Sequence, residues 1–515
     1  MDKKKIINDP IYGFITIKSK LIFEIIEHPF FQRLRRIQQL GLTGFVYPGA
    51  LHTRFHHAIG AMHLMGIALD LLKSKGHEIS DQEYEAAQLA ILLHDIGHGP
   101  LSHTLESSIL TDTPHEKISL VFINHFNREF NGKLDLVIKI FNDKYERRFF
   151  HQLVASQLDI DRLDYLKRDC YYTGVPEGSI SEERIINMLN LVNDELVVEE
   201  KGIYSIENFL NARRLMYWQV YLHKTVISTA QMVISILKRA KSIFHLPAKS
   251  HRQAGQTSSI KHLPSFLPSL SFFLNQNIGV VDFQQDPNCL KQFANLDDHD
   301  IWSAIKLWVN SQDNVLSTIS KNILERKLFK IELTNHPCTK SHLQSIQGKI
   351  CKEFGVSNKD INYFVIHGSL SNSAYISKGL PASEEGKFFA YVIECEDGSL
   401  YKGCTNDLSE RWYNHKIGKA AEWTKSHKPK KIIHWEEFNT EKEAIKREKF
   451  FKSGKGRHWL KEQKNKGKLR QAGETINILM KNGEIVDVAQ AADLPNIKAM
   501  SKIVKKYYLC YPKFF

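Results

Sequence analysis

Histidines and aspartates of the kind that hold divalent metal ions recur in four short segments of the N-terminal half. In chain order the segments are RFHHAIG at 54–60, LLHDIGHGPLSH at 92–103, PHE at 114–116 and LDIDRLDYLKRD at 158–169. The adjacent His94 and Asp95 follow a buried apolar run, and Gly97 and Gly99 end the expected helix soon after. A neutral imidazole beside a carboxylate at such a point can hold one divalent ion.

A complete metal site needs further ligands from elsewhere in the chain. His57 and a carboxylate from the later DID segment complete a mixed nitrogen and oxygen set, which suits Fe, Mn, Ni, Zn or Mg. Such a site leaves positions open for water and substrate, and its ion acts on phosphate oxygens as a Lewis acid. A lone His-Asp pair is more often packed or solvated, but the four segments together predict a metal-dependent phosphate-ester hydrolase.

The same segments resemble the HD superfamily, and within it the deoxynucleoside triphosphate triphosphohydrolases of the SAM-and-HD-domain type. The resemblance runs from about Phe14 to Ala240 and includes QQLG, YPGALHTRFHHAIG, LLHDIGHGPLSH and DIDRLDYLKRDC. It implies hydrolysis of a dNTP to a deoxynucleoside and triphosphate by a homo-oligomer. No Walker-type GxxxxGK[ST] loop is present, which argues against kinase or ATPase chemistry.

Residue by residue, the resemblance implies three sets of site residues. The metal ligands are His57, His94, Asp95 and Asp161, and Asp159 orients a ligand. The catalytic set around the scissile phosphate is His98, His103, His115 and Glu116, of which His98 and Glu116 have a structural hydrogen bond as their alternative role. The substrate-binding set is Gln39, Arg54, Arg162, Tyr165, Arg213, Tyr221 and Lys224. Arg162 departs from the lysine that some members of the family have there, so the charge is kept but the geometry is not.

A second group of reactive side chains lies within 387–465. The segment FFAYVIECEDGSLYKGCTNDLSERWYNH predicts two strands joined by a turn, then a helix with Arg411 and His415 one turn apart on one face. The later helix TEKEAIKREKFFKSG carries Glu448 among basic residues. A carboxylate in that setting can hold a divalent ion such as Mg²⁺ beside a DNA phosphate, and an ordinary salt-bridged helix face is the alternative.

The whole of this segment resembles the GIY-YIG nuclease domain, close to its small stand-alone bacterial type. The resemblance implies that Tyr391, Tyr401, Arg411 and Glu448 are catalytic, with His415 where the family often has a histidine. The two motifs are AYV and YKG in place of GIY and YIG, but both tyrosines and Gly403 are kept. The tryptophans Trp412, Trp423 and Trp435 can stack on bases, although such residues more often belong to a core.

The composition is that of an ordinary globular protein with one strongly basic region. Of 515 residues 42% are hydrophobic and 25% charged, no apolar run reaches the roughly 20 residues of a membrane span, and the basic start lacks the apolar core of a signal peptide. Seven scattered cysteines without a CxxC pair predict a reducing cytoplasm. Residues 387–470 hold 21 Lys and Arg against 12 Asp and Glu, a net +9 of the total +13, which indicates either a DNA partner or a solvated surface.

The elements that must position these residues form a multidomain, mostly helical chain. Apolar stretches at 85–93 and 225–237 predict buried helices, and a second helical stretch covers about 288–328. Strands are predicted at Phe329–Leu333, Tyr363–His367 and Ile476–Met480, with a helix at 341–354 and a hairpin at Asn482-Gly483.

The order of these elements predicts an α+β C-terminal region interrupted by a small α/β domain. Removing 380–473 would bring AYIS beside TINILM as two strands of one sheet, as expected for an insertion at an exposed loop. The predicted domains are a helical HD domain at 1–245, the first part of the C-terminal region at 246–379, a GIY-YIG nuclease-like domain with its linkers at 380–473, and the second part of the C-terminal region at 474–515.

Three functions follow in order of preference. The first is a metal-dependent HD phosphohydrolase acting on dNTPs and carrying an endonuclease-like insert. The second is a DNA endonuclease tethered to an HD scaffold. The third is a nucleotide-binding regulatory module without turnover, against which the presence of all four metal ligands argues.

Overall fold

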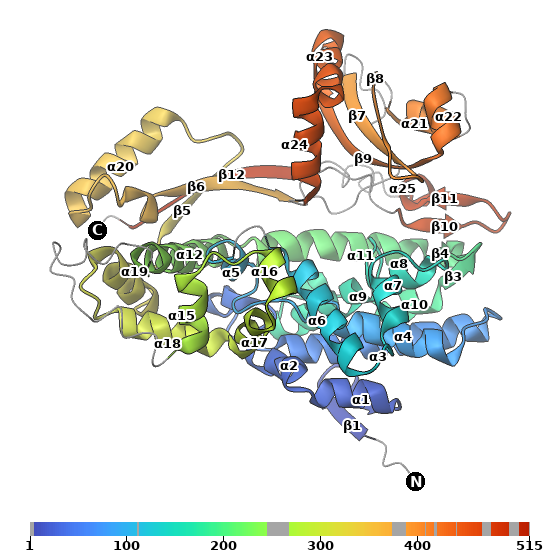
Figure 1. The fold of residues 1–515 in the computed structure, drawn as a ribbon, viewed down its shortest axis with the longest axis horizontal. Coiled ribbons are helices and arrows are strands. Elements are labelled where there is room, and N and C mark those ends of the chain that lie inside the picture. The colour runs from blue at the N-terminus through green and yellow to red at the C-terminus, as the bar shows by residue number, and fades with distance from the viewer. Residues whose placement is uncertain are drawn as a thin grey trace. The chain divides into compact units, whose positions relative to one another are not determined.

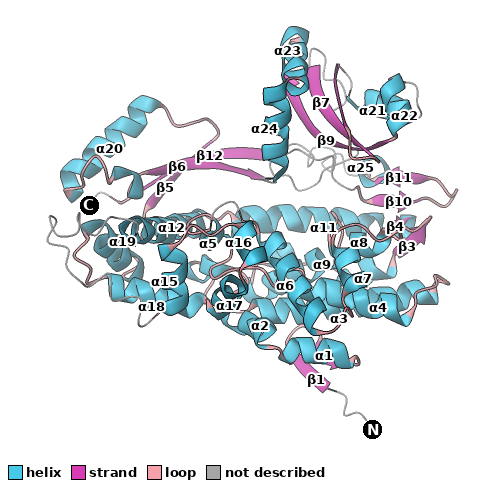
Figure 2. Ribbon diagram, viewed as in Figure 1, coloured by secondary structure: helices cyan, strands magenta, loops and turns pink. Residues whose placement is uncertain are grey.

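The computed structural model describes residues 5–110, 113–244, 267–372, 388–406, 408–416, 420–438, 440–465, 475–493 and 504–513. The chain divides into two compact units, Met1–Ala374 with Ile503–Phe515, and Tyr375–Lys502. Helices make up most of the larger unit, and strands gather at the centre of the smaller one (Figure 2). The domain limits at 245, 379 and 473 fall on residues outside the described ranges, so those limits stay a prediction.

The larger unit is a helical domain with small strand pairs at its margin (Figure 1). Its first half contains β1 (Lys5–Asp9), β2 (Gly13–Ile17), α1 (Lys20–Glu27), α2 (Pro29–Gln32), α3 (Arg54–Ser74), α4 (Asp81–Leu93), α5 (His103–Glu106), α6 (His115–Glu129), α7 (Asp135–Phe141), α8 (Phe149–Val154) and α9 (Ile160–Thr173). It continues with α10 (Glu182–Asn187), β3 (Leu189–Val192), β4 (Glu195–Glu199), α11 (Ile203–Met216), α12 (Lys224–Phe244), α15 (Pro268–Asn275), α16 (Val280–Gln285), α17 (Pro287–Asn295), α18 (Asp298–Trp308) and α19 (Asn314–Leu324). The buried helices predicted at 85–93 and 225–237 are parts of α4 and α12, and the stretch predicted at 288–328 comprises most of α17, α18 and α19.

Helix α3 runs through the core of this unit and is apolar almost all round. By length and composition it is the one described helix that meets the test for a membrane span, and the bent pair Glu200–Tyr221 and Lys224–Phe244 meets it together. However, 72% of the apolar stretch of α3 that meets this test is buried inside the fold. A helix that is hydrophobic on every side belongs in a core as well as in a bilayer, and the burial explains its composition.

Helix α4 is fixed at its start by side chains, and this places its end. The Ser80 hydroxyl accepts a hydrogen bond from the Glu83 backbone N–H, and the Glu83 carboxylate accepts one from the Ser80 N–H, as in a capping box. The helix ends at Leu93, so His94 and Asp95 lie at its C-terminal end. Gly97 then lets α6 approach, because a Cβ there would lie 2.2 Å from the His115 carbonyl oxygen.

A three-stranded antiparallel sheet completes the larger unit. Strand β12 (Val504–Tyr511) lies between β5 (Lys330–Thr334) and β6 (Ile366–Asn372), with α20 (Lys340–Phe354) between β5 and β6 in the chain. The strand predicted at Tyr363–His367 begins later than expected, because residues Ile361–Tyr363 form a 3-10 turn. The segment AYIS lies outside the described residues, and the strand that pairs with β6 is β12.

The smaller unit is built on a second three-stranded antiparallel sheet. Its central strand is β7 (Phe388–Cys395), flanked by β8 (Leu400–Thr405) and β9 (Pro429–Phe438). Alternate residues of β7 enter two apolar clusters, one with Leu408 and Ile432 and the other with Phe451 and Leu460. The helices of the unit are α21 (Leu408–Lys416), α22 (Glu422–His427), α23 (Glu441–Lys452) and α24 (Gly454–Asn465). The sheet is therefore covered on both faces, as its mainly apolar central strand requires.

The predicted hairpin at Asn482-Gly483 is present in the smaller unit. Strand β10 (Asn477–Leu479) pairs with β11 (Ile485–Asp487), and the short helix α25 (Val488–Ala491) follows. Gly483 has a φ of +83°, which a residue without a Cβ adopts at low cost.

Candidate active sites

Four of the predicted metal ligands converge at one point in the larger unit. The Nε2 atoms of His57 on α3 and His94 after α4 lie 3.1 and 3.3 Å from the same Oδ1 of Asp161 on α9. The two Nε2 atoms are 3.5 Å apart, and Asp95 Oδ1 is 3.4 Å from that of His94. Ligand atoms about 2.1 Å from one ion lie roughly 3 to 3.5 Å apart around it, so the spacing fits a single divalent metal ion.

The hydrogen bonds on the far side of both rings explain why a cation fits there. His57 Nδ1 lies 2.7 Å from the Asp164 carboxylate, and His94 Nδ1 lies 2.6 Å from the Ile91 carbonyl oxygen. A carbonyl oxygen only accepts, so His94 carries its proton on Nδ1 and offers a lone pair at Nε2. Two nitrogen lone pairs and a carboxylate oxygen then face one another, which is unfavourable without a positive charge between them.

The pKa values of His57 and His94 also indicate that a positive charge is favoured at this point. Burial lowers the pKa of His57, but the carboxylates of Asp161 and Asp164 outweigh burial and raise that pKa to about 10. The pKa of His94 is raised as well, because Asp95 and Asp161 outweigh its burial. A divalent ion bound to the two Nε2 atoms would balance the charge of the same carboxylates without a proton. The nitrogen and oxygen donor set suits Fe, Mn, Ni, Zn or Mg.

Two stacked histidines adjoin the candidate metal ligands. The rings of His98 and His115 lie 3.6 Å apart and nearly parallel, at 19°, and together with Asp95 they form a second group that can hold an ion. Burial and the Arg54 guanidinium hold the pKa of His98 well below its ordinary value. Burial also lowers the pKa of His115, but Glu106 and Asp95 raise it overall, so the two rings favour opposite charge states.

Glu106, a residue that the sequence did not predict, contacts both histidines. Glu106 Oε1 lies 3.2 Å from His115 Nδ1 and 3.7 Å from His98 Nδ1. The predicted Glu116 is instead 63% exposed, with its Oε1 3.6 Å from His115 Nε2. The position of Glu106 three residues after His103 in HTLE was the available signal. His103 itself begins α5, and its side chain lies outside what the structure describes.

Three arginines from the predicted substrate set leave guanidinium donors without a partner among the described residues. Arg54 donates to Asp95 Oδ2 at 2.6 Å and to Ser102 Oγ at 3.0 Å, but its buried Nε has no acceptor. Arg162 pairs with Asp159, and its Nε is also unpartnered. Arg213 on α11 is 8% exposed, yet both Nε and Nη1 lack an acceptor. Buried donors of this kind point to an anionic ligand.

The remaining predicted substrate residues lie close to these arginines or at the surface. Tyr165 interacts electrostatically with Arg213 and Arg162, and its ring meets that of Tyr221 edge to face at 6.1 Å. Gln39 has a buried Oε1 without a partner among the described residues. Lys224, in contrast, is exposed at the first residue of α12.

Three aspartates of the segment 158–169 take contacts that the sequence did not reveal. Asp159 caps α9 by accepting from the Arg162 N–H at 2.8 Å, and the carboxylate that holds His57 is that of Asp164. Asp169 accepts from the Tyr221 hydroxyl at 2.7 Å and lies 2.8 Å from His52 Nε2. Asp161 and Asp164 are one helical turn apart, and this spacing was the signal that both side chains face α3.

A second candidate site lies in the smaller unit. The Tyr391 hydroxyl is 2.9 Å from His415 Nε2 and accepts a hydrogen bond from Arg411 Nε at 3.3 Å. The Tyr401 ring lies 4.8 Å from that of His415. Gly403 is opposite Tyr391 on β8, and a Cβ there would lie 2.5 Å from the tyrosine oxygen. The structure thus brings together both tyrosines, the arginine and the histidine of the predicted set.

Glu448, the fourth predicted catalytic residue of this unit, has different neighbours. It pairs with Lys452 at 2.5 Å and interacts electrostatically with the Cys404 thiol of β8. Burial and Arg411 lower the pKa of His415 to about 4, so this histidine is neutral near pH 7. The pKa of Tyr391 is raised by burial, so both groups are uncharged beside Arg411.

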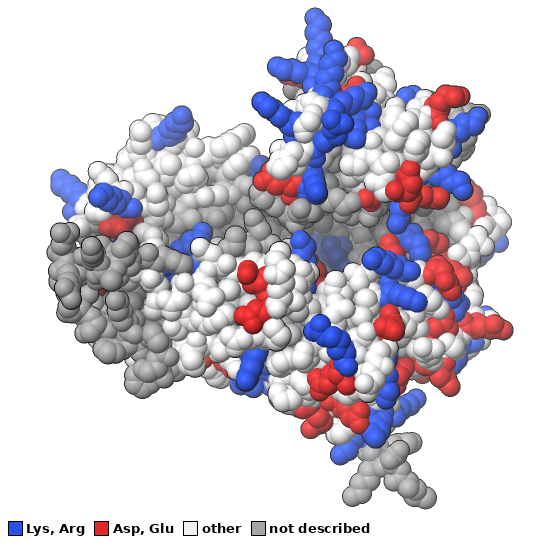
Figure 3. Space-filling model, viewed as in Figure 1, with Lys and Arg blue, Asp and Glu red and all other residues white. Residues whose placement is uncertain are grey.

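The aromatic and basic residues of the smaller unit divide between core and surface. Trp412 and Trp435 pack against the apolar cluster around β7, whereas Trp423 is 38% exposed and stacks on His427 at 4.1 Å. Lysine and arginine side chains gather over α23 and α24 on the face drawn in Figure 3. Only Trp423 of the three predicted stacking residues is therefore at the surface.

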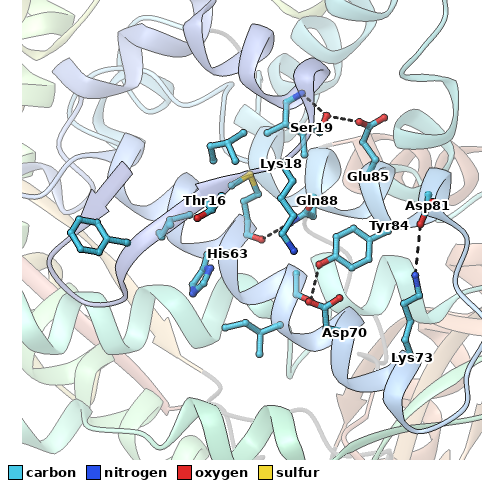
Figure 4. A pocket seen from close by; sticks show the side chains of 17 residues that line it. Thr16, Lys18, Ser19, His63, Asp70, Lys73, Asp81, Tyr84, Glu85 and Gln88 are labelled. Carbon is cyan, nitrogen blue, oxygen red and sulfur yellow. Dashed lines mark hydrogen bonds and ion pairs between the residues drawn. The ribbon is translucent and has the colours of Figure 1, made fainter. Parts of the chain in front are cut away.

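A cavity of about 660 Å³ in the larger unit is distinct from both sites. Residues of β2, α1, α3 and α4 line it, and Figure 4 shows the side chains of Asp70 and Tyr84 meeting at its wall. None of the predicted site residues contributes to the lining.

Comparisons with known proteins find relatives for both units. Family models match at two places, the GIY-YIG catalytic domain at residues 387–464 and the HD associated region at residues 180–254. A solved phosphohydrolase from Bacteroides thetaiotaomicron VPI-5482 is 40% identical with a TM-score of 0.73, and the match covers 99% of this chain and 100% of that one.

Two curated relatives are deoxynucleoside triphosphate triphosphohydrolases. The SAMHD1 homolog of Dictyostelium discoideum is 30% identical over 349 residues, which are 63% of this chain and 59% of the relative. The SAMHD1 protein of Bos taurus is 27% identical over 335 residues, or 56% and 55%. The chain thus spans less than two thirds of the length of either relative.

The helical fold, the convergent histidines and aspartates and these matches define a phosphohydrolase with a candidate divalent metal site. The chain belongs to the HD phosphohydrolases and carries a GIY-YIG domain.

Proposed function

We propose that the larger unit hydrolyses deoxynucleoside triphosphates to deoxynucleoside and triphosphate. The observation that carries the proposal is the set of unpartnered guanidinium donors on Arg54, Arg162 and Arg213. Arg54 contacts the candidate ligand Asp95, and Arg162 interacts electrostatically with the candidate ligand Asp161. A triphosphate carries several negative charges, and planar guanidinium groups suit its oxygens. The two triphosphohydrolase relatives supply the substrate class.

The residues divide the work of the reaction. His57, His94, Asp95 and Asp161 would hold a divalent ion, which when bound polarises phosphate oxygen and lowers the pKa of a bound water. The arginines bind and orient the phosphates. His115, in contact with Glu106, donates a proton to the leaving 5′ oxygen, because general acids must lie beside the group that departs. Tyr165 and Tyr221 border the sugar, and Gln39 reads the deoxyribose.

Triphosphate release tests this proposal. The purified chain is incubated with each dNTP and with Mn²⁺, Mg²⁺ or Fe²⁺, alongside the Asp95→Ala and Glu448→Ala variants. Release that disappears in Asp95→Ala and persists in Glu448→Ala supports the proposal. No release from any dNTP with any metal would refute it. Binding of dNTPs without release would then favour a regulatory module without turnover.

A second activity is favoured by the cluster of Tyr391, Tyr401, Arg411 and His415 in the smaller unit. We propose that this GIY-YIG domain cleaves DNA with Mg²⁺ held at Glu448. The basic side chains over α23 and α24 are suited to bind the DNA backbone. Nicking of plasmid or branched DNA that is lost in Arg411→Ala but kept in Asp95→Ala would support this activity. Equal nicking by both variants would reject it.

We propose that the protein works in the cytoplasm as a homo-oligomer. All seven cysteines are free in the structure, as a reducing cytoplasm would keep them. The triphosphohydrolase resemblance implies a homo-oligomer, which light scattering after gel filtration measures directly. A monomer at micromolar concentration, with and without dNTPs, would contradict the assembly.

A further inference from the structure

A chain of buried charged groups links the N-terminal hairpin to the metal ligand His57. The Asp9 carboxylate at the end of β1 accepts from Arg168 Nη1 at 2.8 Å. The Nη2 and Nε atoms of Arg168 donate to the two oxygens of Asp164 at 2.8 and 2.9 Å. Asp164 Oδ2 in turn lies 2.7 Å from His57 Nδ1. Four residues from β1, α3 and α9 therefore form one continuous path.

Every member of this path is excluded from water. Asp9 is 2% exposed, and the side chains of Arg168, Asp164 and His57 are 0% exposed. Buried charges are stable only when paired and hydrogen-bonded. Two carboxylates and one guanidinium leave a net charge of −1, which faces a ring whose other nitrogen points at the metal position. The charge of Asp9 thus contributes to the negative potential at that position.

The helix α3 is shaped to let this path through. Gly60 lies one turn after His57, and a Cβ at Gly60 would lie 2.0 Å from Arg168 Nη2 and 2.2 Å from Asp164 Oδ1. Any other residue there would displace the guanidinium or its carboxylate. A bare backbone at this point keeps the ion pair directly behind His57.

The turn of the hairpin is fastened to the same groups. Asp9 Oδ1 accepts from the backbone N–H groups of Ile11 at 2.9 Å and Tyr12 at 3.1 Å, which fixes the turn between β1 and β2. The Tyr12 hydroxyl interacts electrostatically with Asp164, and Arg168 lies over the Tyr12 ring at 5.6 Å. One carboxylate oxygen of Asp9 therefore shapes the hairpin turn while the other holds Arg168.

We propose that Asp9 is a positioning residue for the metal site, so that docking of the N-terminal hairpin sets the affinity for the divalent ion. Partners behind a metal-bound histidine orient its ring and raise its basicity. Asp9 acts on His57 through Arg168 and Asp164. When the hairpin turn leaves its place, Arg168 loses one of its two partners and Asp164 becomes a weaker acceptor. The inference rests on His57 being a metal ligand, and it holds whichever phosphate ester is the substrate.

Metal affinity of the Asp9→Asn variant tests the inference. Asparagine keeps the Oδ1 acceptor for Ile11 and Tyr12, and it removes the charge together with the Oδ2 acceptor for Arg168. All variants carry Glu448→Ala, so that the smaller unit does not compete, and the probe is Co²⁺ followed by its visible absorption. We expect affinity to fall about 10-fold in Asp9→Asn and by up to about 100-fold in Asp164→Asn. Asp81→Asn removes the same charge from a fully exposed position and serves as the matched control.

Hydrogen exchange supplies a second measurement that a merely structural role would leave unchanged. Coupling between two sites is reciprocal, so Co²⁺ should slow exchange at the Ile11 and Tyr12 amides in the parent chain and not in Asp9→Asn. Co²⁺ affinities within twofold in the parent and Asp9→Asn, or an equal loss in Asp81→Asn, would overturn the proposal. Co²⁺ binding that survives His57→Ala would overturn its premise, and failure of dNTP turnover alone would not affect it.

Discussion

The histidines of the candidate phosphohydrolase site differ in the partner that each ring has at Nδ1. His57 and His94 each have a fixed acceptor at Nδ1, which leaves Nε2 free for a metal ion. His115 has the Glu106 carboxylate at Nδ1, and Glu106 and Asp95 raise its pKa. Under the proposed function, His57 and His94 bind the metal ion and His115 donates the proton, and the partner at Nδ1 orients each ring.

The proton donor is testable by comparing two glutamates. His115→Gln should lower the rate of triphosphate release by about 10²- to 10⁴-fold, the usual worth of a general acid. Glu106→Gln should lower it by about tenfold through its contact with His115, and the exposed Glu116→Gln by less than about threefold. Metal content measured on each variant controls for loss of the ion. A larger loss in Glu116→Gln than in Glu106→Gln would contradict the assignment.

In the nuclease-like site, the position of Tyr391 depends on the absence of a side chain at Gly403. Gly403→Ala places a methyl group 2.5 Å from the Tyr391 hydroxyl, so the tyrosine must move away from Arg411 and His415. We expect faster hydrogen exchange along β7 and β8 and loss of any DNA cleavage. Gly454→Ala is the matched control, because nothing lies within 4 Å of its added Cβ. Equal exchange in the two variants would show that Tyr391 accommodates the methyl group.

At the scale of elements, three helices supply the four candidate metal ligands. Helix α3 contributes His57, the end of α4 contributes His94 and Asp95, and the first turn of α9 contributes Asp161. Sites on rigid helices hold their geometry better than sites on loops. The start of α4 is therefore important to a site that lies at its other end.

The capping box of α4 gives the protein a stability that depends on pH. Burial alone would raise the pKa of Glu83, but bonds from Ser80, Arg147 and Tyr145 outweigh it and lower the pKa from 4.5 to about 2. A carboxylate with a depressed pKa stabilises the fold fully above its unfolded pKa and loses that effect as pH falls through the folded one. Glu83 should therefore contribute about 1 to 2 kcal/mol at pH 7 after an allowance for solvent screening, lost as the pH falls from about 4.5 to 2.

Glu83→Gln measures this contribution in chemical unfolding. The variant should be less stable than the parent at pH 7, and the difference should shrink as pH falls below about 4.5. Glu78→Gln, at an exposed position just before the helix, should change the free energy of unfolding by less than about 0.5 kcal/mol. A pH-independent difference between parent and Glu83→Gln would mean that the carboxylate charge is not what stabilises α4.

The elements that the sequence predicted are those whose signal is local. The buried helices α4 and α12, the strands around Gly398 and the hairpin at Gly483 all follow from periodicity or turn residues. Strand β12 was not predicted, because its place between β5 and β6 depends on pairing over more than 130 residues. Asp9 was missed for the same reason, since its partner Arg168 lies 159 positions away.

At the scale of the whole molecule, the candidate phosphohydrolase site and the sheet of β5, β12 and β6 belong to one unit of the chain. The ligands, the stacked histidines and the arginines lie between residues 54 and 213, and the sheet closes with β12 near the C-terminus. The GIY-YIG cluster has its own sheet and its own apolar cores. The chain therefore leaves the larger unit after β6, and its last strand, β12, belongs to the larger unit again.

This arrangement predicts that the insert is dispensable for hydrolysis, whereas the last strand is not. Joining residue 379 to residue 474 removes 380–473 and keeps β12, so we expect a soluble chain that binds metal and turns over substrate at the parental rate. Ending the chain at 379 also removes β12 and leaves the facing edges of β5 and β6 unpaired, which favours aggregation. Solubility, metal content and triphosphate release compare the two deletions. Loss of metal from the internal deletion would show that the larger unit requires the insert, and a soluble, active terminal truncation would show that β12 does not hold the sheet.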